Sequence, residues 1–281
     1  MKRAAIVIAV LGMCAVSFGQ GNDKPAAQNP PAGQAAAPQG KRPPAAKTQP
    51  EFEAYKAAMG QTDPAAFEKA VNDFAAKFPD SELRALLYDA AMQRYQQTNN
   101  ANKMIEMGRK VLAIDPDDPA ALVGVSQALA EQTHDTDLDK DQKIAEAKKD
   151  AERALVTVDT DVPTTGNPPE KVAAFKSYLR SEAYVVLGTI SFKANNWPDA
   201  EVNLRKSIEA LPDQPDTIAV FRLAVALDMQ NKYPEALKYA NQAVDLTKDH
   251  PDTGAGKAAR EEKDRLMKLS SGTAPGQNAP K

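Results

Sequence analysis

An internal repeat of 36 residues in the second half of the chain constrains its fold more than any other feature. The segments NNWPDAEVNLRKSIEALPD and NKYPEALKYANQAVDLTKD, which begin at Asn195 and Asn231, align without a gap. Self-similarity at a period of about 20–50 residues is typical of arrays of small supersecondary units. The sequence therefore predicts a stack of similar units, each burying one face on the next.

Each unit reads as helical. Apolar and small residues recur at i, i+3, i+4 and i+7, as in the stripe that runs from Tyr184 to Phe192. That spacing places them on one face of an α-helix. Asp or Asn followed closely by Pro punctuates the chain, for example at Asp63-Pro64 and around Trp197, and such residues cap and begin helices. We find no alternating pattern of useful length that would indicate β-strands.

The two copies resemble the tetratricopeptide repeat. The residues that carry the resemblance in the first copy are Tyr184, Leu187, Gly188, Ala200, Leu204, Ser207 and Pro212, and in the second Leu223, Ala224, Ala236 and Ala243. The resemblance implies an all-α fold, a right-handed superhelical solenoid of antiparallel helical hairpins. It also implies small residues where two helices cross, and we expect Gly188 and Ala200 to face each other there.

Looser copies extend the array in both directions. Residues 51–80, 88–116 and 119–159 keep parts of the pattern, and 255–269 reads as a polar capping helix of the kind that such arrays need for solubility. Residues 51–270 are thus predicted to form about five hairpins and a cap. Residues 271–281 are predicted to be a disordered tail.

The N-terminal end indicates export. Lys2 and Arg3 precede a short apolar run, and small residues suit cleavage after Gly19, so residues 1–19 are predicted to be a signal peptide. Residues 20–50 are rich in Pro, Ala, Gln and Gly and are predicted to be a disordered linker. We expect a periplasmic or secreted protein without a transmembrane helix. An alternative is an envelope lipoprotein, because the residues before Cys14, the only cysteine, resemble a lipobox.

The function that the resemblance implies is protein binding without catalysis. Family members bind peptides or partner helices in a concave groove lined by the first helix of each repeat. The positions that map to this groove are Asp89, Gln93, Gln96, Gln127, Glu131, Thr189, Lys193 and Asp228. The paired Lys, Arg and Asn with which some members clamp a C-terminal carboxylate are missing. A formal charge of −3, from 35 basic and 38 acidic residues, gives no basic field for nucleic acid.

No cofactor, metal or catalytic constellation is predicted. His134 and His250 are far apart and lack partners at zinc-ligand spacing. One acidic insertion leaves an alternative open: Asp135, Asp137, Asp139, Asp141 and Glu146 fall on ligand positions of a calcium loop. Lys140 stands where that loop needs Gly, which favours a solvated insertion. A calcium-responsive binder or an enzyme built on the array remain the alternatives to a scaffold.

Overall fold

The computed structural model describes residues 41–270. The predicted signal peptide at 1–19 with Cys14, the first part of the predicted linker at 20–40 and the predicted tail at 271–281 lie outside the described residues. The predictions made for those segments therefore stay predictions.

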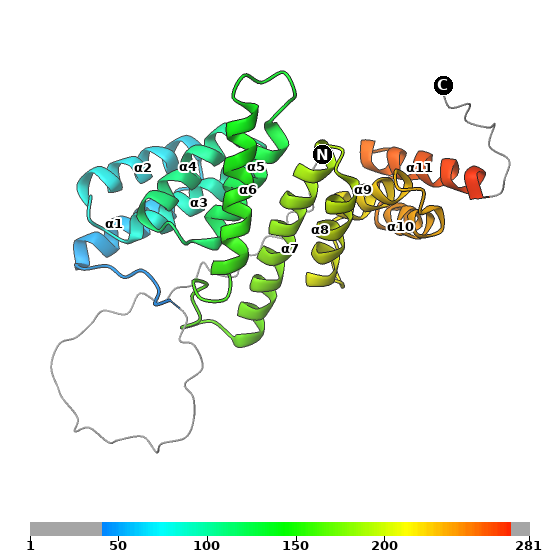
Figure 1. The fold of residues 1–281 in the computed structure, drawn as a ribbon. Coiled ribbons are helices and arrows are strands. Elements are labelled where there is room, and N and C mark those ends of the chain that lie inside the picture. Colours follow the sequence, from blue (N-terminus) through cyan, green and yellow to red (C-terminus); the bar gives the residue numbers. More distant parts are fainter. Residues whose placement is uncertain (1–40, 271–281) are drawn as a thin grey trace, which may run out of the picture. The chain divides into compact units, whose positions relative to one another are not determined.

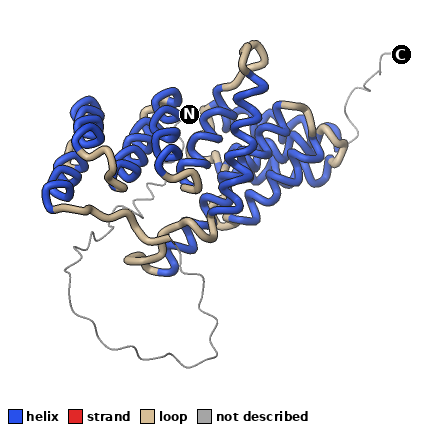
Figure 2. The backbone as a smooth tube through the Cα atoms, turned by 60° about the vertical axis from the view of Figure 1, so that its left-hand side comes forward, coloured by secondary structure: helices blue, strands red, loops and turns tan. Residues whose placement is uncertain are grey.

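Every regular element between residues 41 and 270 is an α-helix (Figures 1 and 2). This confirms the predicted all-α class. In chain order, the helices are α1 (Gln49–Met59), α2 (Pro64–Lys77), α3 (Leu83–Gln97), α4 (Ala101–Ile114), α5 (Pro119–Gln132), α6 (Lys140–Thr157), α7 (Pro169–Lys193), α8 (Trp197–Ala210), α9 (Thr217–Asp228), α10 (Tyr233–Leu246) and α11 (Gly254–Ser270).

The described residues form two compact units. The N-terminal unit contains residues 41–128 and 153–176, and the C-terminal unit contains residues 129–152 and 177–270. In the N-terminal unit α1 and α2 both contact α3, which in turn pairs with α4. In the C-terminal unit α8 contacts α9, α9 pairs with α10, and α11 packs on both. Within each unit, a hairpin thus leans on the next element of the stack.

Three hairpins turn in the same way. Asn99, Asn195 and Asn231 follow α3, α7 and α9 and have φ of 55°, 55° and 60°. The N–H of the next residue donates in each case to the carbonyl five positions back, at 2.9 Å. This is the left-handed helix end that Gly usually supplies and that Asn tolerates. The structure therefore places one turn geometry at both copies of the 36-residue repeat and at a third hairpin.

Helix starts follow the predicted punctuation. The side chains of Asp63, Asn196 and Asp216 accept hydrogen bonds from backbone N–H groups three residues on, at 2.8, 3.4 and 2.7 Å. Pro64 and Pro198 lie in the first turn of α2 and α8, where a missing N–H leaves no bond unmade. Local sequence thus sets where α2, α8 and α9 begin.

Small residues allow the helices of neighbouring elements to approach closely. A Cβ added to Gly188 would lie 2.7 Å from both Cγ and Cδ2 of Leu204 on α8. The three atoms nearest to such a Cβ all belong to Leu204, one helical turn after the Ala200 that we expected opposite Gly188. A Cβ on Gly108 would collide with Val125 on α5. The requirement for a small residue holds, although its partner differs.

The core of the C-terminal unit consists mostly of Ala and Leu. Leu204, Leu223, Ala224 and Ala236 are fully buried, and Leu266 of α11 joins the same cluster. Other repeat positions differ in burial: Gly188, Ala200, Ser207 and Ala243 are buried, Tyr184 and Leu187 are half-buried, and Pro212 is exposed. The capping helix therefore contributes one large side chain to the core and leaves polar residues outside.

Trp197 packs at a hairpin turn, as its equivalence to Tyr233 suggests. Its ring lies 5.3 Å from that of Phe192 in an edge-on arrangement, and both aromatic side chains at the equivalent turns border the core. Edge-on pairs at this separation stabilise packing.

The predicted linker differs from the structure at its end. Helix α1 already begins at Gln49, and residues 41–47, rather than lacking structure, form hydrogen bonds with the helical array. The segment contains three cationic residues, Lys41, Arg42 and Lys47, among its prolines and alanines. Their carboxylate and carbonyl partners lie up to 120 positions away in the sequence. A reading of local composition cannot find such partners.

Candidate protein-binding surface

Helix α3 carries three of the predicted groove residues in succession. Gln93 Nε2 donates to Asp89 Oδ2 at 2.8 Å, one helical turn away, and Gln93 and Gln96 are exposed. The other oxygen of Asp89 is buried and has no hydrogen-bond partner among the described residues. Burial, with a smaller contribution from the charge of Asp118, raises the pKa of Asp89 from 3.8 to about 7.

The fourth groove residue of the N-terminal unit comes from the next hairpin. Gln96 Nε2 donates to Oε1 of Gln127 on α5 at 3.4 Å. Gln127 is only 4% exposed, so its amide is mostly committed inside the protein. The structure thus brings α3 and α5 together at these positions, as the predicted surface requires. The exposed polar groups on it belong to α3.

In the C-terminal unit, the side chain of Lys193 caps the C-terminal end of α5. Its ammonium donates to three main-chain carbonyls at the end of α5, those of Ala130 at 2.7 Å, Glu131 at 3.1 Å and Thr133 at 3.1 Å. Carbonyls at a helix C-terminus carry partial negative charge and favour a cation. Burial and the nearby charge of Arg222 lower the pKa of Lys193. This predicted groove residue therefore has a clear structural role.

The last two groove positions also form contacts within the C-terminal unit. Thr189 is 2% exposed and accepts a hydrogen bond from Arg222 at 2.6 Å. Asp228 is 7% exposed and pairs with Arg265 of the capping helix, which also binds Glu262 at 3.0 Å. A buried carboxylate with a charged partner ties α11 to the end of α9.

The eight predicted groove residues thus fall into two classes. Thr189, Lys193 and Asp228 bind other parts of the protein, and Gln127 is buried. Gln93 and Gln96 are exposed beside the half-buried Asp89, and Glu131 is exposed at the end of α5. Ligand binding at these positions stays a prediction, and α3 is the helix that carries two exposed amides beside a half-buried carboxylate.

Comparison with known proteins gives structural neighbours only. No protein-family model matches the chain, and no curated protein does. The solved structures that resemble it include MamA, at 14% identity over 67% of this chain and 89% of that one, with a TM-score of 0.37. They also include TTC0263, a thermophilic TPR protein in Thermus thermophilus, at 13% identity over 77% and 98%, with a TM-score of 0.42.

The chain has a tetratricopeptide-like helical-repeat fold. Its own geometry carries this conclusion: one turn recurs at equivalent positions, and a small residue stands where neighbouring helices approach closely.

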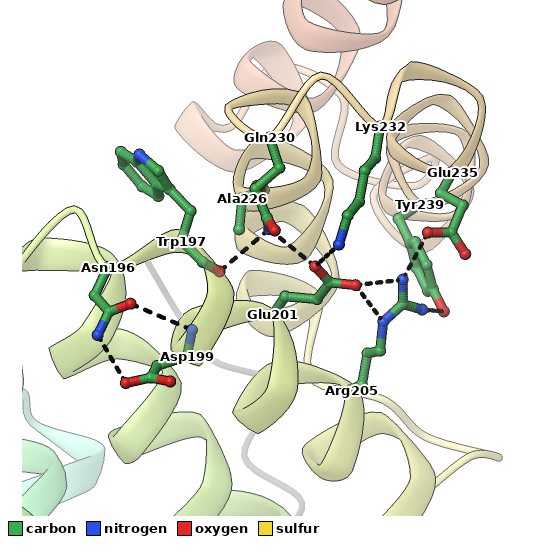
Figure 3. Close-up of polar contacts among 10 residues, drawn as sticks. All are labelled: Asn196, Trp197, Asp199, Glu201, Arg205, Ala226, Gln230, Lys232, Glu235 and Tyr239. Atoms are coloured by element: carbon green, nitrogen blue, oxygen red, sulfur yellow. Dashed lines mark hydrogen bonds and ion pairs between the residues drawn. The ribbon is translucent and has the colours of Figure 1, made fainter.

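A polar cluster that sequence reasoning missed joins two hairpins of the tetratricopeptide-like array (Figure 3). Glu201 of α8 accepts hydrogen bonds from Arg205 on the same helix, from Gln230 at 2.9 Å and from Lys232 at 2.6 Å. Arg205 continues to Glu235 at 2.9 Å and to the hydroxyl of Tyr239 at 3.0 Å, both on α10. We call these side chains the Glu201 clamp.

The Glu201 clamp is well satisfied. Burial acts to raise the pKa of Glu201, but the donors Lys232, Arg205 and Gln230 outweigh it and the pKa is lowered. The repeat alignment gives no signal for it, because Glu201 aligns with Leu237 and Lys232 aligns with Asn196. Its members meet only because α8 packs on the next hairpin.

The acidic insertion between α5 and α6 is paired with lysines. Lys140 binds Asp135 at 2.6 Å, and Lys143 lies 2.9 Å from Asp139 and 3.5 Å from Asp137. Within residues 41–270, no group of three or more His, Cys, Asp or Glu side chains is arranged to hold a metal ion. Three of the four aspartates of the calcium-loop alternative, Asp135, Asp137 and Asp139, are thus paired with lysine ammonium groups.

Between residues 41 and 270, no helix combines the length and the apolar character that crossing a bilayer requires.

Proposed function

We propose that this protein is a non-catalytic scaffold that binds protein partners through the polar surface of α3 formed by Asp89, Gln93 and Gln96. Support comes first from the fold, since stacked hairpins present long helix surfaces on which extended peptides and partner helices dock.

The observation that carries the proposal is the incomplete satisfaction of Asp89. Other carboxylates with little exposed surface are satisfied: Glu201 has Lys232 and Asp228 has Arg265. Glu51 accepts hydrogen bonds from the Ser81 hydroxyl and the Lys47 N–H. Asp89 has one amide donor, an unpartnered oxygen and a raised pKa. A buried carboxylate oxygen without a partner costs stability. Proteins tolerate such costs at functional sites more readily than elsewhere, because a partner supplies the missing interaction.

Site-specific crosslinking tests this surface. A photoreactive residue at position 93 or 96 should form crosslinked adducts with a defined partner in extract of the source cells. The same residue at position 69, an exposed site on α2 whose side chain is 77% exposed, serves as the matched control. Adducts of equal yield and identity at positions 93 and 69 would refute binding at α3.

We further propose that the scaffold acts outside the cytoplasm. The proposal rests on the basic and apolar N-terminal sequence that ends at Gly19. N-terminal sequencing of the mature protein should begin at Gln20. A lipoprotein would instead begin at a lipid-modified Cys14 and would lose its membrane association in a Cys14→Ser variant. An intact Met1 in the purified protein would overturn both forms of export.

A further inference from the structure

The segment that precedes α1 runs along one edge of the N-terminal unit. Its contacts fall at three successive connections between hairpins: Asp80 and Glu82 between α2 and α3, Asp115 between α4 and α5, and Thr160 with Asp161 after α6. We call residues 41–47 the strap and these acidic connections the loop edge. The strap thus crosses the ends of the first three hairpins, in the direction opposite to the order of the array.

Ion pairs hold the N-terminal end of the strap. The Lys41 ammonium pairs with Asp115 and lies 3.6 Å from Asp161, and its backbone N–H donates to Thr160. Arg42 binds Glu82 at 2.6 Å. Burial acts to lower the pKa of Lys41, but the hydrogen bond and charge of Asp115 raise it, so the ammonium is charged at neutral pH.

The far end of the strap uses carbonyl and carboxylate acceptors. Lys47 Nζ donates to the carbonyl of Asp80 at 2.8 Å, and its backbone N–H donates to Glu51 at 2.7 Å. Glu51 is itself buried and also accepts a hydrogen bond from Ser81. Lys41 and Arg42 at one end of the strap and Lys47 at the other therefore each have an acceptor on the loop edge. These acceptors are Asp115, Glu82 and the carbonyl of Asp80.

The middle of the strap suits an extended binding mode. Pro43, Pro44, Ala45 and Ala46 are half-buried, and the Ala45 N–H reaches Glu82 at 3.4 Å. Consecutive prolines need no N–H partners and are already extended, so ordering them costs little entropy. Grooves that bind proline-rich peptides use the same property.

The strap is held by exposed contacts. The side chains of Arg42 and Glu82 are 68% and 40% exposed, and that of Lys41 is 38% exposed. Exposed ion pairs are individually weak and are screened by salt. Several weak contacts hold a segment in place when it belongs to the same chain, and they also allow it to be displaced.

We propose that the loop edge is a binding site for basic, proline-containing segments of partner proteins, and that the strap occupies it as a displaceable internal ligand. The partner segment has two adjacent cations, a short proline-containing stretch and a third cation, as in the strap. This inference concerns the loop edge and not the α3 surface, so it does not rest on the function proposed above.

Competition in trans tests the proposal. The probe is a fluorescent peptide of sequence KRPPAAKT, residues 41–48, and the proteins are the full chain and a full chain in which residues 41–47 are replaced by Gly and Ser. A tethered ligand acts at an effective concentration in the millimolar range, so the peptide should bind the replaced chain about ten-fold more tightly than the natural chain.

Matched variants locate the binding. Glu82→Lys in the replaced chain should abolish peptide binding, whereas the same reversal at exposed Asp73 on α2 should leave it unchanged. If the replaced chain fails to fold, Lys41→Ala/Arg42→Ala in the full chain serves instead, with a smaller gain in peptide binding. Circular dichroism checks the fold of every variant.

Three results would overturn the proposal. These are equal binding to the natural and replaced chains, absence of binding to a folded replaced chain, and peptide binding to the Glu82→Lys variant that is as tight as binding to the Asp73 control. Loss of crosslinks at positions 93 and 96 leaves this test unaffected, so the two proposals fail separately.

Discussion

Two carboxylates, one in each unit, show how differently this array treats buried charge. Glu201 in the C-terminal unit accepts from Arg205, Gln230 and Lys232, and its pKa is lowered in spite of burial. Asp89 in the N-terminal unit has one amide donor, and burial raises its pKa to about 7. The free-energy cost of burying a carboxylate is thus offset by hydrogen-bond donors at Glu201 and is not offset at Asp89.

The difference between the two carboxylates distinguishes a residue that holds hairpins together from one that is available to a binding partner. Glu201 lies where two hairpins meet, so its partners come from the next hairpin and strengthen the stack. Asp89 lies on α3, the first helix of its hairpin, beside the exposed amides of Gln93 and Gln96. A hydrogen-bond partner for its free oxygen can there come from another molecule. A repeat protein can tolerate such a site, because its stability is the sum of many small interfaces.

Close packing of α7 on α8 should contribute most to the stability of the C-terminal unit. A substitution that disturbs this packing is therefore expected to give the largest loss of stability. Gly188→Val places atoms within 3 Å of Leu204 and should destabilise the protein by about 3 kcal/mol, the upper range for overpacking. Urea unfolding followed by circular dichroism measures this. Gly254→Ala is the matched control, since a Cβ there meets no atom within 4 Å. A Gly188→Val variant as stable as the control would show that the close approach is not required.

The Glu201 clamp should come second. Glu201→Ala leaves Lys232 and Arg205 without their shared acceptor and should cost about 2 kcal/mol at neutral pH, less than a fully buried pair because Lys232 reaches solvent. Since the folded pKa of Glu201 lies below its unfolded value of 4.5, the contribution is present above that value and is lost as the pH falls through the folded pKa. Equal destabilisation in acid and at neutral pH would contradict the electrostatic assignment.

Asp89 should show the opposite sign. Its folded pKa of about 7 exceeds its unfolded value of 3.8, so the native state holds the proton more tightly and loses stability as the pH rises between the two values. Asp89→Asn should therefore stabilise the protein by about 1–2 kcal/mol near pH 8, less than the full shift implies because the side chain is only half-buried.

Thermal unfolding near pH 4 and pH 8 tests the Asp89 prediction, because the gain should vanish at the lower pH. Asn should also weaken partner capture at α3. A variant that is destabilised at both pH values would mean that the Asp89 carboxylate has a partner in solution, and the contrast with Glu201 would collapse.

Local sequence predicted the turns and caps because their chemistry lies within a few residues. Asn195 and Asn231 turn alike since each closes the helix just before it. The uses of Lys193 and Asp228 could not be predicted, because their partners lie on other hairpins, 62 positions away for Glu131 and 37 for Arg265. A groove position inferred from a family pattern carries no information about such partners, which depend on how the hairpins stack.

Removing the cations of the strap should give the smallest change in stability, because their ion pairs are exposed whereas Glu201 is largely buried. Lys41→Ala/Arg42→Ala should cost about 0.5–1 kcal/mol at low ionic strength. The loss should shrink in about 1 M NaCl, where the Debye length is ~3 Å. The hydrogen bond from Arg42 lowers the pKa of Glu82 against the smaller effect of burial, so this contribution is present above pH 4.5 and is lost in acid.

Hydrogen exchange of the α6–α7 connection provides the sharper measurement for the strap. Releasing Lys41 removes a backbone hydrogen bond to Thr160 and a charge from Asp161, so exchange around those residues should accelerate in the double variant. Exchange around α8–α10, which the Glu201 clamp holds, should not change. Acceleration confined to the strap and the loop edge would show that exposed charges hold a displaceable segment, whereas the largely buried Glu201 holds the hairpins of the C-terminal unit together.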